Sequence, residues 1–259
     1  MNLHLKDKKA LVTGASFGLG KAAALALAHE GCSLYLNSRS QANLQTTADE
    51  IQKLTNVKPV LIEADLSQKS DFEKIAESIL DIDILVSNAG GPQPGKFTDL
   101  KNEAWENASA LVLSSARKLT SMVIDGMIKR KFGRLIYITS IGVLQPVDDL
   151  ILSNTYRAAV TGMCKTISNT YAQHGITANC VCPGFTATER LTNLANARAE
   201  ASGKTPEEIL QSFTDQIPAG RIGNPEELAA LITFLASEKA GYITGTSIPV
   251  DGGYVRSLI

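Results

Sequence analysis

The sequence predicts an α/β protein built around one doubly wound parallel sheet with helices on both faces. Short apolar runs alternate with longer segments of helical periodicity along the 259-residue chain. Strands that alternate with helices in this way lie parallel, because a parallel pair needs a crossover connection. No linker or change of composition divides the chain, and a hydrophobic content of 44% suits one sizeable core. We therefore expect a single domain over residues 1–259.

The expected strands are short apolar runs, most of which end in polar or glycine-containing segments. They cover residues 10–12, 33–36, 60–62, 82–86, 135–138, 176–182 and 246–250. The expected helices have apolar residues at helical spacing or are rich in strong helix formers. They cover residues 18–30, 41–54, 70–80, 101–130, 153–173 and 225–235. The polar segment 189–216 is expected to form a helical flap over a substrate, with a solvated pair of helices as the alternative.

A glycine-rich turn at residues 13–20, Thr-Gly-Ala-Ser-Phe-Gly-Leu-Gly, separates the first strand from the first helix. Gly14, Gly18 and Gly20 allow positive φ angles and close approach of the backbone to a ligand. A strand, a tight turn and a helix in this order present a helix N-terminus to a phosphate group. The pattern indicates a nucleotide-binding, Rossmann-type fold, in which ligands bind outside the carboxyl ends of the strands.

Charge and composition favour a protein of the cytoplasm that binds neither nucleic acid nor membranes. The formal net charge is −1 and only 5% of the residues are aromatic. No apolar run approaches the roughly 18 residues of a membrane span, and the first residues lack the apolar segment of a signal peptide. The four cysteines form no Cys-x-x-Cys pair and the three histidines are scattered. We therefore expect free buried thiols in a reducing compartment, and no metal site.

Taken together, these segments resemble the short-chain dehydrogenase/reductase family over nearly the whole chain. The glycine turn is similar to the family's cofactor turn, and residues 88–90, Asn-Ala-Gly, are similar to its sheet-stabilising signature. Residues 183–188, Pro-Gly-Phe-Thr-Ala-Thr, resemble the segment over the nicotinamide carboxamide. Residues 217–228 and 242–253 resemble the C-terminal blocks of members that are similar to 3-oxoacyl-[acyl-carrier-protein] reductases.

The end of the second strand favours NADP(H) as the cofactor. NAD binders tend to carry an acidic residue there for the ribose 2′-hydroxyl, but residues 37–39 read Asn-Ser-Arg. Arg39 can pair with a 2′-phosphate and Ser38 can donate to it, so NAD(H) is the less favoured cofactor. The further cofactor-binding residues that the resemblance implies are Gly14, Ser16, Phe17, Gly18, Leu19, Asp65, Leu66, Asn88, Gly90, Arg157, Gly184, Thr186 and Thr188.

The resemblance implies reduction of a carbonyl by hydride transfer, for which the family uses a serine, a tyrosine, a lysine and an asparagine. Ser140 fits the family's serine. The tyrosine is expected about thirteen residues after it and about thirty residues before the Pro-Gly pair, and both counts give Ser153. The lysine position, four residues further on, holds Arg157, and the asparagine position falls near Val112.

These departures leave several hypotheses open, since a serine hydroxyl is a weak acid and arginine cannot relay a proton. The first is an altered carbonyl/alcohol oxidoreductase site made of Ser140, Ser153 and Arg157, with water or the substrate as the proton source. In the second, Tyr156 takes over as the acid, although a role in the core is at least as plausible for it. In the third, the chain binds NADP(H) without turnover, as a sensor or scaffold. A lyase or epimerase reaction on the same cofactor is a further alternative.

The resemblance also implies a homodimer or a homotetramer. In that assembly, the helices that begin near Lys101 and Ser153 pack between subunits, and the C-terminal strand forms a second contact. The expected ligand besides the cofactor is a small-molecule carbonyl compound or alcohol.

Overall fold

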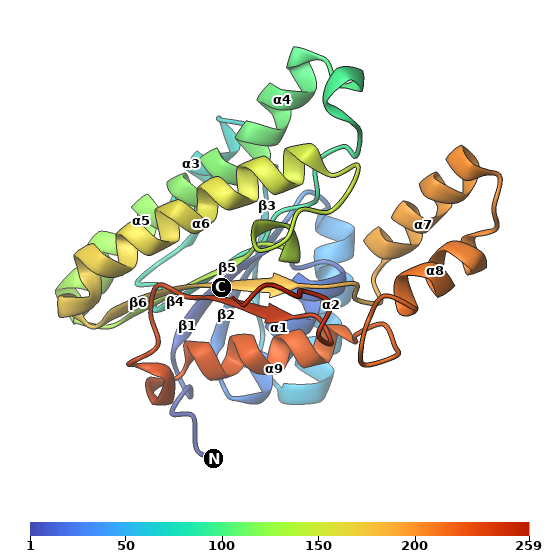
Figure 1. Cartoon of the computed structure of the whole chain (residues 1–259). Coiled ribbons are helices and arrows are strands. Elements are labelled where there is room, and N and C mark those ends of the chain that lie inside the picture. The colour runs from blue at the N-terminus through green and yellow to red at the C-terminus, as the bar shows by residue number, and fades with distance from the viewer. Residues whose placement is uncertain (259) are drawn as a thin grey trace.

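The computed structural model describes residues 1–258 and places seven parallel strands in one sheet with helices on both faces (Figure 1). The order across the sheet is β3-β2-β1-β4-β5-β6-β7. The strands are β1 (Lys9–Thr13), β2 (Ser33–Ser38), β3 (Val60–Glu63), β4 (Ile84–Ser87), β5 (Gly133–Ile138), β6 (Ile176–Pro183) and β7 (Ser247–Val250). The predicted fold is confirmed. The strand order reverses between β1 and β4, which is where sheets of this kind bind their ligands.

Helices connect the strands and cover both faces of the sheet. They are α1 (Gly18–His29), α2 (Gln41–Thr55), α3 (Asp71–Ser78), α4 (Asn102–Ala108), α5 (Ser115–Arg130), α6 (Ile151–Tyr171), α7 (Glu189–Ser202), α8 (Pro206–Thr214) and α9 (Pro225–Ala236). Short 3₁₀ turns cover Phe97–Asp99, Ile141–Val143, Ala172–His174 and Glu238–Ala240.

Two apolar layers hold the sheet between the helices. Side chains of α1, α2 and α9 pack on one face of the sheet, and side chains of α3, α5 and α6 pack on the other. Along β1, Ala10 and Val12 face the first layer and Leu11 faces the second. Successive side chains of a strand point to opposite faces, so a strand that is covered on both faces reads as a continuous apolar run.

The segment 101–130 differs from the single helix that the sequence predicts. It consists of α4, a π-helical segment over Ser109–Ser114, and α5. π-helical turns inside α-helices are rare and occur frequently at functional sites. Val112, near which the family's asparagine was expected, lies in this segment and is buried in the apolar layer.

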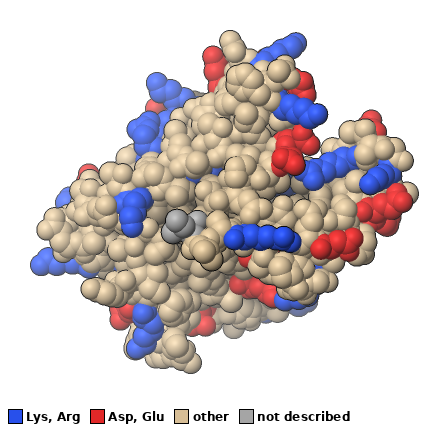
Figure 2. Space-filling model, in the orientation of Figure 1, with Lys and Arg blue, Asp and Glu red and all other residues tan. Residues whose placement is uncertain are grey.

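Segment 189–216 forms two helices, α7 and α8, that extend beyond the sheet (Figure 1). Thr205 and Glu208 form a capping box at the start of α8 with Pro206 in its first turn, which explains why a helix begins there. The pair has an apolar cluster of its own, in which Phe213 stacks on Phe185 with ring centroids 4.4 Å apart. Charged side chains gather on this pair in Figure 2, whereas the surface over α6 is mostly uncharged.

Candidate active site

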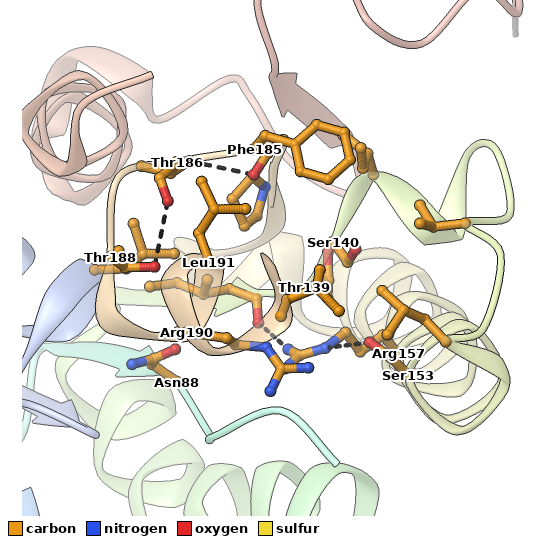
Figure 3. A pocket seen from close by; sticks show the side chains of 18 of the residues that line it. Asn88, Thr139, Ser140, Ser153, Arg157, Phe185, Thr186, Thr188, Arg190 and Leu191 are labelled. Carbon is orange, nitrogen blue, oxygen red and sulfur yellow. Dashed lines mark hydrogen bonds between the residues drawn. The ribbon is translucent and has the colours of Figure 1, made fainter. Parts of the chain in front are cut away.

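A cavity opens between the carboxyl ends of β4, β5 and β6 and the helix α7 (Figure 3). It holds about 790 Å³ of space, part of which is open solvent. The residues that line it are Leu19, Asn88, Ala89, Ile138, Thr139, Ser140, Ile141, Val147, Leu150, Ser153, Arg157, Pro183, Gly184, Phe185, Thr186, Thr188, Arg190, Leu191 and Leu194.

The turn after β1 is packed so closely that only glycine fits at two positions. Gly14 has a φ of 58°, and a Cβ there would lie 2.7 Å from Nδ2 of Asn88. A Cβ at Gly20 would lie 2.2 Å from the carbonyl oxygen of Gly14. Thr13 Oγ1 donates to the Asn88 carbonyl at 2.8 Å and accepts from the Asn88 N–H at 2.9 Å. These contacts attach the turn to the loop that follows β4.

The first turn of α1 is open to a ligand. Phe17 precedes the helix in an extended conformation, and no side chain caps the helix N-terminus. A Cβ at Gly18 would lie 3.1 Å from Cγ2 of Thr188, so the turn also contacts the residue that precedes α7. Ser16 is partly exposed next to them, and Leu19 reaches the cavity wall. An uncapped helix N-terminus beside a glycine backbone fits the phosphate groups of a dinucleotide.

The end of β2 carries no carboxylate. The Asn37 side chain donates to the carbonyls of Ile62 and Ala64 and is buried, whereas Arg39 is exposed without a hydrogen bond or ion pair to the described residues. Ser38 is buried, and its Oγ donates to the Ser40 carbonyl at 3.3 Å.

Two residues that were predicted to bind the cofactor lie after β3. The Asp65 carboxylate accepts from the backbone and side chain of Ser67, both at 2.8 Å, and Leu66 is buried. The carboxylate of Asp65 therefore holds its own loop in place.

Four residues after β4 and β6 that were predicted to bind the cofactor line the cavity. They are Asn88, Gly184, Thr186 and Thr188. Thr186 Oγ1 donates to the Gly184 carbonyl at 3.2 Å, and Thr188 Oγ1 donates to the Thr186 carbonyl at 3.3 Å. Gly90 does not line the cavity. It is exposed, and a Cβ there would have no neighbour within 4 Å.

The fold brings Ser140, Ser153 and Arg157 together at the cavity wall (Figure 3). Arg157 is only 7% exposed. Its Nε donates to Ser153 Oγ at 3.1 Å, its Nη1 to the Ile138 carbonyl at 2.9 Å and its Nη2 to the Ala89 carbonyl at 3.3 Å. The guanidinium therefore joins α6 to the ends of β5 and β4.

The two serine hydroxyls are held in the same way. Ser153 Oγ accepts from the Arg157 guanidinium, and Ser140 Oγ accepts from the Gly142 N–H at 3.0 Å. Neither hydroxyl donates to an acceptor among residues 1–258. A hydroxyl has one donor hydrogen, so both serines can donate a hydrogen bond to a ligand in the cavity.

The cavity wall is positively charged. Burial lowers the pKa of the Arg157 guanidinium to about 10, and the charge of Arg190 adds to this lowering. Arg157 still carries its charge at neutral pH. Its three hydrogen bonds use three of the five N–H donors that a guanidinium has, so two remain for a ligand. No aspartate or glutamate is among the described residues that line the cavity.

Tyr156, the alternative proton donor, is not among the residues that line the cavity. Its ring contacts the edge of Trp105, with centroids 6.1 Å apart, and lies against the apolar layer that α5 and α6 share. This contact packs the ring of Tyr156 against Trp105 of α4. Tyr156 is therefore one of the aromatic packing residues between α4 and α6.

Arg190 is the residue at the site that sequence reasoning missed. It lies in the first turn of α7, and its guanidinium rests on the backbone of Gly91, where a Cβ would be 1.7 Å from Arg190 Cζ. Figure 3 shows the Arg190 guanidinium beside that of Arg157. An arginine two residues after Thr188 and a Gly-Gly pair at residues 90–91 were the available signals. Only the fold shows that they meet.

Among residues 1–258, no helix is both long enough and apolar enough to cross a membrane. In that part of the chain, no three or more histidine, cysteine, aspartate or glutamate side chains are grouped to hold a metal ion. The four cysteines are buried and unpaired.

Comparison with known proteins gives matches over almost the whole chain. A family model described as enoyl-(acyl carrier protein) reductase matches residues 14–255. The chain is 37% identical over 259 residues to a 3-oxoacyl-[acyl-carrier-protein] reductase of Synechocystis, covering 97% of this chain and 98% of that protein. It is 31% identical to the NADPH-dependent reductase BacG of Bacillus subtilis, covering 98% of this chain and 100% of the relative. The crystal structure of an L-sorbose reductase from Gluconobacter frateurii with NADPH and L-sorbose superposes with a TM-score of 0.94 at 30% identity, and each chain is covered completely.

Proposed function

The chain belongs to the short-chain dehydrogenase/reductase family of oxidoreductases, and on this premise we propose an NADP(H)-dependent enzyme that interconverts a carbonyl compound and an alcohol. The proposal includes an atypical active site. Ser153 and Arg157 stand where the family resemblance places a tyrosine and a lysine.

The arrangement of Ser140, Ser153 and Arg157 is the observation that carries this proposal. Each hydroxyl accepts a hydrogen bond from a fixed donor behind it and keeps its own hydrogen free to donate into the cavity. The buried cation lies directly behind Ser153. Fixed donors of this kind stabilise negative charge that develops on an oxygen atom.

Ser140, Ser153 and Arg157 bind and stabilise the carbonyl oxygen of the substrate. The chemistry that NADPH would supply when bound is a hydride for the carbonyl carbon, which would leave negative charge on the carbonyl oxygen. Ser140 and Ser153 donate hydrogen bonds to that oxygen, and the Arg157 charge stabilises it through Ser153. The proton that completes the alcohol comes from water, directly or by way of Ser153 Oγ, because arginine holds its proton at neutral pH. Alcohol oxidation runs through the same contacts in reverse.

The cofactor preference has support from both charge and similarity. The end of β2 offers the exposed Arg39 and no carboxylate, which favours a 2′-phosphate over a free 2′-hydroxyl. The glycine turn and the uncapped start of α1 fit the pyrophosphate. Similar proteins are described as NADPH-dependent or contain NADPH. NADP(H) is therefore the proposed cofactor, ahead of NAD(H).

Replacing Ser153 tests the proposed site. Ser153→Ala should lower kcat for NADPH-dependent reduction about 10²- to 10³-fold, as expected when one donor to a developing oxyanion is lost. Binding of NADPH, measured by its fluorescence, should change little. Tyr156→Phe is the matched control on the same helix, because Tyr156 is not among the residues that line the cavity, and it should leave the rate within about twofold.

Two results would count against this site. A large loss with Tyr156→Phe and none with Ser153→Ala would return the acid role to the tyrosine. Intact NADPH binding without oxidation of NADPH, across a broad set of aldehydes, ketones and 3-oxoacyl thioesters, would favour a sensor or scaffold.

We also propose a homodimer or homotetramer in the cytoplasm, with α7 and α8 as a flap over the substrate. Helix α6 carries one exposed charged residue, Lys165, and the surface over α6 is mostly uncharged in Figure 2. Such a surface suits packing between subunits. The four unpaired cysteines suit a reducing compartment. Light scattering during size-exclusion chromatography tests the assembly, and a mass of one chain would contradict it.

A further inference from the structure

Arg190 presents an unpaired cation to the cavity. No hydrogen bond or ion pair joins its guanidinium to another of residues 1–258, whereas Arg157 next to it donates to three partners. The guanidinium rests on Gly91, a position where any side chain would collide with it. The glycine therefore leaves the space that Arg190 occupies.

The surroundings of Arg190 favour an anion. The two arginines are the only charged residues among the described cavity-lining residues, and the charge of Arg190 helps to lower the pKa of Arg157. Two neighbouring cations without a counter-ion repel one another, and a bound anion relieves this repulsion. A guanidinium has parallel N–H groups that match the two oxygens of a carboxylate.

We propose that Arg190 binds a carboxylate of the substrate, so that the enzyme acts on oxo acids and hydroxy acids rather than on uncharged carbonyl compounds. This inference rests on the proposed function and names its substrate class. The carboxylate lies on Arg190 while the carbonyl oxygen lies at Ser140 and Ser153. Leu191, Leu194 and Val147 form an apolar part of the same wall, which suits a hydrocarbon body between or beside the two polar groups.

The position of Arg190 favours the substrate over the phosphates of the cofactor. The phosphate-binding features are the turn after β1 and the start of α1. The Arg190 guanidinium lies instead on Gly91, in the loop after β4, beside Arg157 (Figure 3). Arg157 in turn contacts Ser153 and the end of β5. The free cation is therefore on the side of the serines.

Matched acids and esters test this inference. The substrates are benzoylformate with its methyl ester, and 4-oxopentanoate with its methyl ester, so that two spacings of carbonyl and carboxylate are sampled. We expect Arg190→Gln to lower the ratio of kcat/KM for acid over ester about 10- to 100-fold, the size of a charge-assisted pair. Gly91→Ala should lower the same ratio, because it displaces the guanidinium but keeps its charge. Lys204→Gln, which removes an exposed cation after α7, is the control and should leave the ratio unchanged.

The outcomes separate this inference from the proposed function. If Arg190→Gln leaves the ratio unchanged but raises the Kd of NADPH about tenfold, the arginine binds a cofactor phosphate and the inference is wrong. If the wild-type protein reduces neither acids nor esters, the carboxylate site is tested by binding alone. Calorimetry then measures the binding of each acid and its ester to the complex with NADP⁺. Acid-selective binding that Arg190→Gln abolishes supports the carboxylate site even though the proposed reaction fails. Equal binding of acid and ester, or binding of neither, overturns it.

Discussion

The glycine turn after β1 and the serine–arginine cluster beside β5 lie at the same edge of one sheet, but different parts of the chain build them. At the turn, the backbone and the absence of side chains decide the geometry, as at Gly14 and Gly20. In the cluster, long side-chain contacts decide it, since Arg157 joins three separate elements. The comparison teaches that backbone packing shapes the turn whereas side-chain hydrogen bonds shape the cluster, so variants can disturb one without the other. Residues of the cluster can change while the turn keeps its shape.

Restoring the tyrosine and lysine that the family resemblance places in the cluster should have the largest effect of the variants considered, and the effect should be on kcat. Ser153→Tyr combined with Arg157→Lys supplies a phenol with a neighbouring cation, and a general acid contributes about 10²- to 10⁴-fold to a rate. We expect kcat for reduction of the best wild-type substrate to rise by a factor in that range. The measurement is NADPH oxidation at neutral pH. NADPH binding and the melting temperature serve as controls for folding. A folded, NADPH-binding double variant that is no faster than the wild type would show that the serine–arginine pair does not limit the rate.

Disturbing the turn should have the next largest effect, on stability as well as binding. In Gly20→Ala, the new Cβ would lie 2.2 Å from the Gly14 carbonyl oxygen, and backbone atoms cannot move away as a flexible side chain can. We expect the free energy of unfolding to fall by about 1–3 kcal/mol and NADPH binding to weaken. Denaturant unfolding measures the first and fluorescence the second.

A second glycine provides the control for that prediction. Gly162→Ala in α6 places a Cβ where no atom lies within 4 Å, and alanine favours a helix over glycine by up to about 1 kcal/mol. Gly162→Ala should therefore leave stability unchanged or raise it slightly. Equal losses for Gly20→Ala and Gly162→Ala would contradict the packing argument.

The smallest effect is expected at Arg39, after β2, and it should be on the Kd of NADPH. Arg39→Ala removes an exposed cation, and one such charge contributes up to about 1 kcal/mol to pairing with a phosphate. The Kd of NADPH should rise about fivefold, while the Kd of NADH stays the same. Lys58→Ala, another exposed cation outside this region, is the matched control. Equal weakening of both cofactors in Arg39→Ala would remove the argument for a 2′-phosphate contact.

Residue spacing predicted which residues of α6 line the cavity better than residue type did. Counting from Ser140 and from the Pro-Gly pair placed Ser153 and Arg157 at the tyrosine and lysine positions, and the structure places both at the cavity. The same helix carries Tyr156, whose identity suggested an acid. Its direction depends on Trp105 of α4, which is distant in sequence, so helical spacing alone could not decide it.

The sequence by itself determined the parallel α/β sheet, the glycine turn and several of the residues that reach the carboxyl edge, among them Ser140, Ser153 and Arg157. These follow from local periodicity and from the steric freedom of glycine, which neighbouring residues define. Only the tertiary structure decided that Arg157 joins α6 to two strand ends, that Tyr156 packs against Trp105, and that Arg190 rests on Gly91. Each of these contacts depends on where the end of a long side chain lies after elements that are distant in the sequence have packed together. Residue spacing along the chain does not give the distance between such elements.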